Sequence, residues 1–345
     1  MKYRYHIGMD AHSRNSTFAV MDSKGRIMKI ATVATTEKEL LGFVRSLRGP
    51  KALTFEETML SQWLYVLLKS EVDKLVVCDP KPNKRPGAKT DKIDAVELAD
   101  LLRVGRLKPV FHTDDERIEQ RTLVSGYNDL VQEIVRTKNR YSALYRQSAI
   151  RISGAQAYTD PGMIQTLPTS AQRIVAEPLL GQIELLESHK KVYQKKFAQN
   201  LKRFREMRLI KGIPGFGPVF ANQMVGIVIS PWRFSTKYKF FSYAMLVKHR
   251  QMSDGVAYGE RKVYGNIQLK SIFKMATKVA LSSENAFKRK YQQMILEGIS
   301  QKAASNAVCR SLAATVLGVW KSGKKYDDHY REVMLRKKKG SHNRT

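Results

Sequence analysis

Cysteine is nearly absent from this sequence, which has two, Cys78 and Cys309, in 345 residues. The two are far apart and belong to no Cys/His cluster, which excludes a disulfide framework and a zinc site. No apolar run approaches the roughly 20 residues of a membrane-spanning helix. The segment Met1–His6 also lacks the apolar core of a signal peptide. These absences predict a reduced cytoplasmic protein without a membrane span.

Acidic residues are the second shortage. Lys and Arg total 61 against 31 Asp and Glu, a formal net charge of +30. This excess predicts a polyanionic partner, with nucleic acid as the first candidate and an anionic membrane surface as the rival. Apolar residues make up 43% of the chain, and its length suffices for two or three domains with cores of their own.

Residues 1–112 combine strand signals with helix signals. Short aromatic and β-branched runs predict strands, and Thr36 with Glu39 three residues later predicts a capped helix start. The predicted elements are strands at 3–9, 17–21 and 26–33, a helix at 37–47, a strand at 52–55, a helix at 61–68 and a strand at 75–78. Asp10 then follows the first strand and Glu56 follows the fourth.

Asp91 and Asp94 lie in Lys89–Ala95, between the basic loop Lys81–Gly87 and a helix predicted to reach Arg103. Residues three apart project from the same side of a helix. The two carboxylates can form ion pairs with Lys and Arg, which is the commoner use of an isolated D-x-x-D. They can also bind a hard divalent cation through oxygen.

This order of elements resembles the RNase H-like α/β fold of the RuvC resolvases. In that fold, acidic residues of the first strand, the fourth strand and a later helix converge on Mg²⁺, which stabilises the charge that develops during phosphodiester cleavage. The resemblance implies a metal site formed by Asp10, Glu56, Asp91 and Asp94 for Mg²⁺, with Mn²⁺ as an alternative ion. Taken singly, Asp10 reads as a strand-end turn residue and Glu56 as a solvated charge, but their joint order favours the site.

The remaining chain is predicted to be mostly helical. Apolar and aromatic residues recur at intervals of three and four over 123–144 and 179–204, which predicts two long helices within 113–206. They form either an antiparallel hairpin or arms that pair between subunits. In the α-rich segment 207–322, Ile213–Gly217 predicts a glycine turn whose N–H groups suit phosphate contact, although such turns also serve helix packing. A basic tail, 323–345, follows and is expected to be disordered.

Five short motifs occur in a fixed order along the chain. They are Gly8-Met9-Asp10 with His12, Glu56 with Thr58, Lys89 to Ala95, Ile213 to Gly217, and Ser253 with Gly255 ahead of Gly265-Asn266. With this set, nearly the whole chain resembles the DEDD-type insertion-sequence transposases that include the Piv DNA invertase and act as bridge-RNA-guided recombinases.

The resemblance implies a RuvC-like domain over 1–112, a coiled-coil region over 113–206 and a C-terminal transposase domain over 207–322. That last domain carries a nucleophilic serine, which corresponds to Ser253. The resemblance also implies a homo-oligomer, a dimer or tetramer, that binds double-stranded donor and target DNA together with a structured guide RNA.

Two positions depart from the family pattern. Met59 replaces a glycine that usually follows the threonine, which leaves Glu56 and Glu57 as alternatives, with Glu56 favoured because Thr58 follows it by two residues. Asp254 separates Ser253 from the glycine that usually follows the serine directly. Ser242 and then Ser235 are therefore competing nucleophiles, and Ser253 can also be an ordinary turn serine.

The sequence thus predicts a site-specific DNA recombinase of a mobile element in a prokaryotic nucleoid. It would cleave and exchange strands with Mg²⁺ and an activated serine, and a guide RNA would supply the sequence reading. One alternative is a RuvC-like junction nuclease in which water, activated at the metal, is the nucleophile. The other is a non-catalytic nucleic-acid-binding protein.

Overall fold

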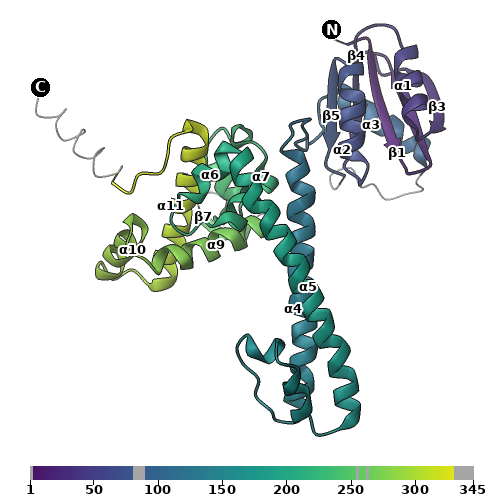
Figure 1. Ribbon diagram of the computed structural model, residues 1–345. Coiled ribbons are helices and arrows are strands. Elements are labelled where there is room, and N and C mark those ends of the chain that lie inside the picture. The colour runs from purple at the N-terminus through teal and green to yellow at the C-terminus, as the bar shows by residue number, and fades with distance from the viewer. Residues whose placement is uncertain (1–2, 81–89, 254–255, 262–263, 330–345) are drawn as a thin grey trace, which may run out of the picture. The chain divides into compact units, whose positions relative to one another are not determined.

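A computed structural model describes residues 3–80, 90–253, 256–261 and 264–329 of the chain. Two compact units make up the chain, Met1–Asp115 and Glu116–Thr345 (Figure 1). The predicted basic loop 81–87, Asp254 with Gly255, and the tail from residue 330 lie outside the described residues. Among the helices that are described, none is long and apolar enough to cross a membrane.

The first unit is built on a five-stranded mixed sheet with the strand order β3-β2-β1-β4-β5. Its elements are β1 (Tyr5–Ala11), β2 (Asn15–Met21), β3 (Ile27–Ala34), α1 (Glu37–Ser46), β4 (Lys51–Glu56), α2 (Ser61–Leu68), η1 (Lys69–Glu71), β5 (Lys74–Cys78) and α3 (Asp91–Arg103). The first three strands form an antiparallel meander, whereas β4 is parallel to both β1 and β5. This mixed α/β unit, followed by a helical second unit, confirms the coarse fold class predicted from the sequence.

Helices cover both faces of this sheet. On one face, Ile7, Met9 and Phe18 share a buried core with α1 and α2, and the Phe18 ring stacks on Phe43 with centroids 4.4 Å apart. On the other face, α3 packs on β1 and β2. Alternation along β1 produces this division, because successive side chains of a strand point to opposite faces.

Two threonines fix the helix starts in this unit. The Thr36 hydroxyl accepts a hydrogen bond from the Glu39 N–H at 3.4 Å, as the predicted cap requires. The Thr90 hydroxyl accepts from the Ile93 N–H at 3.3 Å, so α3 begins at Asp91, earlier than the sequence pattern indicated. Both carboxylates of the D-x-x-D therefore lie in the first turn of α3.

The second unit begins with two long helices that form an antiparallel hairpin (Figure 1). These are α4 (Ile118–Gln147) and α5 (Ser170–Arg203), joined through the turns η3 (Gln156–Tyr158) and η4 (Pro161–Thr166). Near the tip of the hairpin, Tyr141 and Tyr145 are buried and their hydroxyls share a hydrogen bond of 2.7 Å. Ala149, with a φ of 55°, redirects the chain soon after α4 ends.

The base of the hairpin shares one core with the C-terminal helices. Those elements are α6 (Arg205–Lys211), α7 (Pro218–Val228), η5 (Pro231–Arg233), α8 (Lys237–Tyr243), β6 (His249–Ser253), β7 (Val256–Arg261), α9 (Ile267–Leu281), α10 (Ala286–Leu296) and α11 (Gln301–Ser322). Val124 of α4 and Phe197 of α5 belong to this core. The buried Asn200 amide donates to Gln120 and to Asn222, which links α5 to α4 and α7.

The glycine turn between α6 and α7 serves helix packing. Gly215 has a φ of 89°, and a Cβ at this position would lie 2.1 Å from the Ala276 carbonyl oxygen of α9. A side chain is excluded for both reasons. The sequence left two functions open for this turn, phosphate contact and helix packing. The close approach of Gly215 to α9 supports helix packing.

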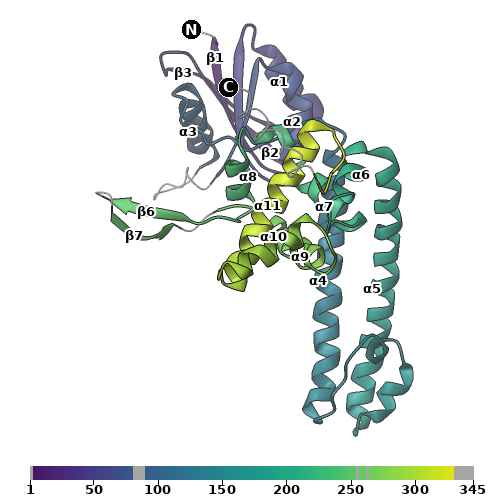
Figure 2. The same cartoon turned by 90° about the vertical axis from the view of Figure 1, so that its left-hand side faces the viewer.

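The strands β6 and β7 form an antiparallel hairpin that extends away from the helices of its unit (Figure 2). The sequence predicted no strand here and left Ser253 as a candidate turn serine. Polar and basic residues dominate β6, and a glycine and two charged residues interrupt β7, so the alternation on which a strand prediction depends is missing. Ser253 is the last residue of β6 and pairs with Val256.

Candidate metal centre

The strand β1 sends alternate residues toward α3. Ile7 and Met9 are fully buried in the core on the opposite face, so Gly8 and Asp10 face α3. At Gly8 the helix is so close that a Cβ would lie 2.1 Å from the Ala95 carbonyl oxygen and 2.5 Å from the Ala99 nitrogen. Asp10 is two residues further along the same face, toward the first turn of α3.

That first turn of α3 carries Asp91 and Asp94. Carboxylates are favoured at a helix N-terminus because the unpaired N–H groups there give a partial positive charge. Asp91 is exposed, whereas Asp94 is partly buried. The helix thus accounts for the position of both residues without any ligand, and their function depends on what faces them.

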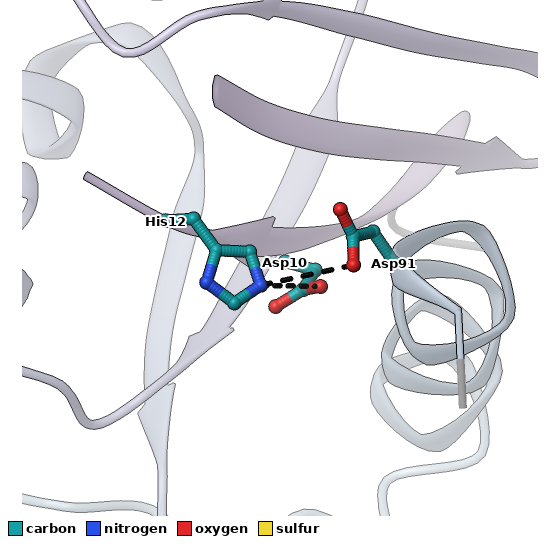
Figure 3. Close-up of side chains that lie close together, drawn as sticks. All are labelled: Asp10, His12 and Asp91. Carbon is teal, nitrogen blue, oxygen red and sulfur yellow. Dashed lines mark ion pairs between the residues drawn. The ribbon is translucent and has the colours of Figure 1, made fainter. Parts of the chain in front are cut away.

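Asp10, His12 and Asp91 face one another across the gap between β1 and α3 (Figure 3). Each offers a ligand atom, and these atoms lie within 4.8 Å of one another. The His12 Nε2 atom is 3.2 Å from Asp10 Oδ2 and 3.8 Å from Asp91 Oδ1. The Asp10 side chain is 21% exposed against 62% for Asp91, so the cluster is anchored inside and open to solvent outside.

Negative charge is concentrated in this cluster. Burial raises the pKa of Asp10, and the nearby charges of Asp91 and Asp94 raise it as well, while His12 acts in the opposite direction. Burial and like charges both disfavour the ionised carboxylate. A bound cation would instead favour the ionised carboxylate of Asp10, because the cation is the largest local charge in such a site.

The donor set suits a hard divalent ion. Mg²⁺ is usually held by one or two carboxylates and keeps several waters, which fits a cluster in which Asp91 and His12 are each about 60% exposed. Carboxylate and water donors also suit Mn²⁺. The residues present therefore fit the ion that the sequence resemblance implied.

Glu56 ends β4 at the same edge of the sheet. The parallel strands β1 and β4 pair Met9 with Phe55, and the next residues in this register are Asp10 and Glu56. Glu56 is partly buried, and its carboxylate lies outside the group that meets within 4.8 Å. The structure thus brings ligand atoms of Asp10 and Asp91 within 4.8 Å of each other. Asp94 lies in the same helical turn as Asp91, and Glu56 lies next to Asp10 in the register of the neighbouring strand.

The adjacent glutamate, Glu57, has different surroundings. Its backbone N–H donates to the Cys78 carbonyl at 2.9 Å, and its carboxylate lies 3.6 Å from Nε2 of the buried His112. Phe55 is fully buried in the core beneath α1 and α2, so alternation directs Glu56 toward the α3 face. The geometry therefore favours Glu56 over Glu57 as the acidic residue of this edge.

Sequence reasoning gave His12 no role beyond its place in a motif. The signal was available, because residues 8, 10 and 12 follow one another at the strand period of two. His12 lies just beyond the end of β1 at Ala11, where a strand prediction gives no side-chain direction. The contacts to Asp10 and Asp91 make it a candidate ligand or a residue that orients the carboxylates.

The candidate serines belong to the second unit, whereas the carboxylates belong to the first. Ser253 ends β6 in the hairpin, Ser242 lies in the last turn of α8, and Ser235 is exposed between η5 and α8. The three candidate serines therefore lie in different parts of the second unit.

Two family profiles match the chain. One, described as a transposase and named DEDD_Tnp_IS110, matches residues 7–149. The other, described as transposase of the IS116/IS110/IS902 family, matches residues 207–292. No curated protein matches the chain.

The first match includes the sheet, the acidic cluster and α4, and the second runs from α6 into α10. The chain therefore carries IS110-family DEDD transposase domains, and it is an enzyme of the DNA transposase and recombinase class.

Proposed function

We propose that this IS110-family transposase cleaves DNA strands at a divalent-metal centre on a RuvC-like first unit. Asp10, Asp91, Asp94 and Glu56 would hold the metal, with His12 beside them. The observation that carries the proposal is the meeting of Asp10, His12 and Asp91 donor atoms within 4.8 Å. The family match supports the reaction class, since DEDD transposases are typically metal-dependent.

Each residue has a definable part in this chemistry. Asp10 is the least exposed of the three and is fixed by β1, so it sets the position of the centre. Asp91 and Asp94 belong to α3, which Gly8 allows to lie against the sheet. His12 contacts Asp10 and so restricts its rotation. When bound, a divalent cation supplies charge stabilisation for the attacking and leaving oxygens of the phosphodiester.

Water is the nucleophile that this geometry supports best. The cluster opens to solvent through Asp91 and His12, each about 60% exposed, and so admits a water molecule and a DNA backbone. The reaction would then resemble that of a RuvC-like nuclease. The non-catalytic alternative loses support because both matching profiles describe transposases.

A serine nucleophile is the second candidate. The second family match, residues 207–292, includes Ser253, Ser242 and Ser235, which supports a functional site in this region. A serine would conserve the energy of the cleaved bond in a covalent serine–DNA phosphodiester, and its hydroxyl would require activation. The carboxylate cluster and the serine would then act together in an oligomer, a dimer or tetramer.

A structured guide RNA and nucleoid association complete the proposal. The net charge of +30 supports the binding of more than one polyanion. The transposase domains support DNA as a partner, which we propose to be double-stranded donor and target DNA, and the motif resemblance supports the guide RNA.

The test is strand cleavage of DNA that carries the flanks of the gene, with and without Mg²⁺. We expect Asp10→Asn and Asp91→Asn to lower cleavage by at least about 100-fold, with DNA binding retained. Asp114→Asn is the matched control, because Asp114 is an exposed carboxylate of the same unit that pairs with Lys69. Asp91→Cys should be inactive with Mg²⁺ and regain part of its activity with Mn²⁺, which binds sulfur better. Full cleavage by Asp91→Asn would show that the site is wrongly assigned.

The same reaction separates the two nucleophiles. A labelled DNA strand that stays attached to denatured protein would indicate a serine link, and Ser253→Ala should abolish it. An adduct that survives Ser253→Ala and disappears with Ser242→Ala would place the nucleophile on α8. Metal-dependent cleavage without any adduct would favour water.

A further inference from the structure

Two aromatic rings of the second unit stand in open solvent within one short segment. Trp232 of η5 is 71% exposed and Tyr238 of α8 is 66% exposed. Single exposed apolar residues are common on protein surfaces. Here, however, two large rings six residues apart are both exposed on a segment with a buried anchor, which indicates a binding surface.

The backbone that carries these rings is fixed in the core. Phe234, between them in sequence, is buried, and its ring centroid lies 5.0 Å from that of Phe240 and 5.3 Å from that of Tyr243. Tyr238 makes an edge contact with Phe241 at 6.0 Å. Because the anchors are buried, the backbone is already ordered and only the side chains of the exposed rings remain to be fixed when a ligand binds, which limits the entropic cost of binding.

Each exposed ring has a cation beside it. The Lys321 ammonium lies 5.2 Å from the Trp232 ring centre and donates to the Phe234 carbonyl at 2.6 Å. The Lys237 ammonium lies 5.3 Å from the Tyr238 ring centre. These four residues, Trp232, Tyr238, Lys237 and Lys321, are called the aromatic platform below.

The sequence around the platform carries no negative charge. Residues 207–253 contain no Asp or Glu, whereas Arg and Lys recur through them. A ligand that contacts both rings and the lysines beside them would need flat apolar faces and negative charge. Unpaired nucleotides meet both requirements, because each has a base with a π-face and a phosphate.

We propose that the aromatic platform binds unpaired nucleotides of single-stranded DNA. Bases would stack on Trp232 and Tyr238, and Lys237 and Lys321 would contact the adjacent phosphates. Intact duplex does not offer this contact, because its bases are stacked on one another. The inference rests on the proposed function in one respect, namely that strand cleavage and exchange supply the single strands.

Fluorescence anisotropy of labelled oligothymidylate, about 20 nucleotides long, tests the proposal with the full chain. The buffer contains EDTA, so that binding is measured without cleavage. We expect Trp232→Ala to weaken binding by about 5- to 100-fold and Tyr238→Ala by a similar factor, as stacking contacts do. Trp232→Phe should stay within about threefold of wild type, because a ring is kept. Trp63→Ala is the matched control, a 40% exposed tryptophan of the first unit.

The salt dependence identifies the type of contact. Because Trp232 carries no charge, Trp232→Ala should leave the slope of log Kd against log salt unchanged, whereas Lys237→Gln should reduce it. Equal weakening of duplex and single strand by Trp232→Ala would overturn the proposal, as would unchanged binding of oligothymidylate. If Trp232→Ala lost binding to oligouridylate but kept binding to oligothymidylate, the proposal would also be overturned and the platform would be assigned to RNA.

The outcomes are independent of the metal centre. If wild-type protein cleaves DNA while Trp232→Ala binds normally, this inference alone fails. If Trp232→Ala loses single-strand binding while wild-type protein shows no metal-dependent cleavage, the proposed function alone fails.

Discussion

Substitution of Gly8 by alanine tests whether α3 is held where the metal centre needs it. The added Cβ would lie 2.1 Å from the Ala95 carbonyl oxygen, 2.5 Å from the Ala99 nitrogen and 2.9 Å from the Leu98 Cβ. Two of these three atoms belong to the backbone of α3, so no side-chain rotation relieves the overlap. The helix itself must move away from the sheet.

The expected cost follows from that displacement. Overpacking a core by one carbon costs about 1–3 kcal/mol, and the upper end applies here because the obstructing atoms are backbone. Movement of α3 also carries Asp91 and Asp94 away from Asp10. A misplacement of about 1 Å in a catalytic site lowers activity by about 100-fold. Gly8→Ala should therefore lose both stability and cleavage activity, with DNA binding largely retained.

Hydrogen exchange of β1 and α3 peptides in the full-length chain measures the local effect, because amide exchange reports the opening free energy of each segment. Gly42→Ala is the control. Gly42 lies in α1 of the same unit, and an added Cβ would meet nothing within 4 Å. Alanine at such a helical position should stabilise by about 0.5–1 kcal/mol. If Gly8→Ala exchanged like wild type and kept full cleavage activity, α3 would not lie against Gly8 and the described meeting of Asp10 and Asp91 would be refuted.

Three further predictions concern charge. Because burial and like charges raise the pKa of Asp10 in the folded state, its ionised form costs stability above that pKa, and this cost is relieved as pH falls through it. Without metal, Asp10→Asn should therefore be more stable than wild type near neutral pH, as measured by hydrogen exchange. Mg²⁺ should stabilise the wild type but not the variant. A metal-free variant less stable than wild type would contradict the burial of this carboxylate. DNA affinity should fall linearly with salt on logarithmic axes, by about 0.9 per phosphate contacted, and a salt-independent Kd would contradict phosphate binding. Protein expressed with the flanks of its gene should co-purify with a structured RNA, whereas full recombination by RNA-free protein would exclude a guide.

Local sequence patterns determined much of the first unit. The aromatic and β-branched run over residues 3–9 predicted the first strand, although β1 extends to Ala11 and so includes Asp10. Thr36 predicted the start of α1, because a cap involves residues only three positions apart. The cap at Thr90, which starts α3, was recognised only in the structure. The hairpin β6–β7 was not predicted, because it lacks such a local signal. Its first strand, β6, is mostly polar and basic, and its second, β7, contains a glycine and two charged residues, so neither shows a continuous alternation of apolar residues.

The sequence by itself determined the chemistry available to this protein: the excess of positive charge, the paired carboxylates Asp91 and Asp94, and the ordered motifs of a transposase. Only the tertiary structure decided which residues meet. His12 joins Asp10 and Asp91 because α3 lies against β1 at Gly8. Glu56, which the sequence motif already favoured over Glu57, lies next to Asp10 because β4 runs parallel to β1 in one register. Both outcomes depend on contacts between segments more than 40 residues apart, and such pairing is set by packing of the whole sheet, which no local pattern encodes.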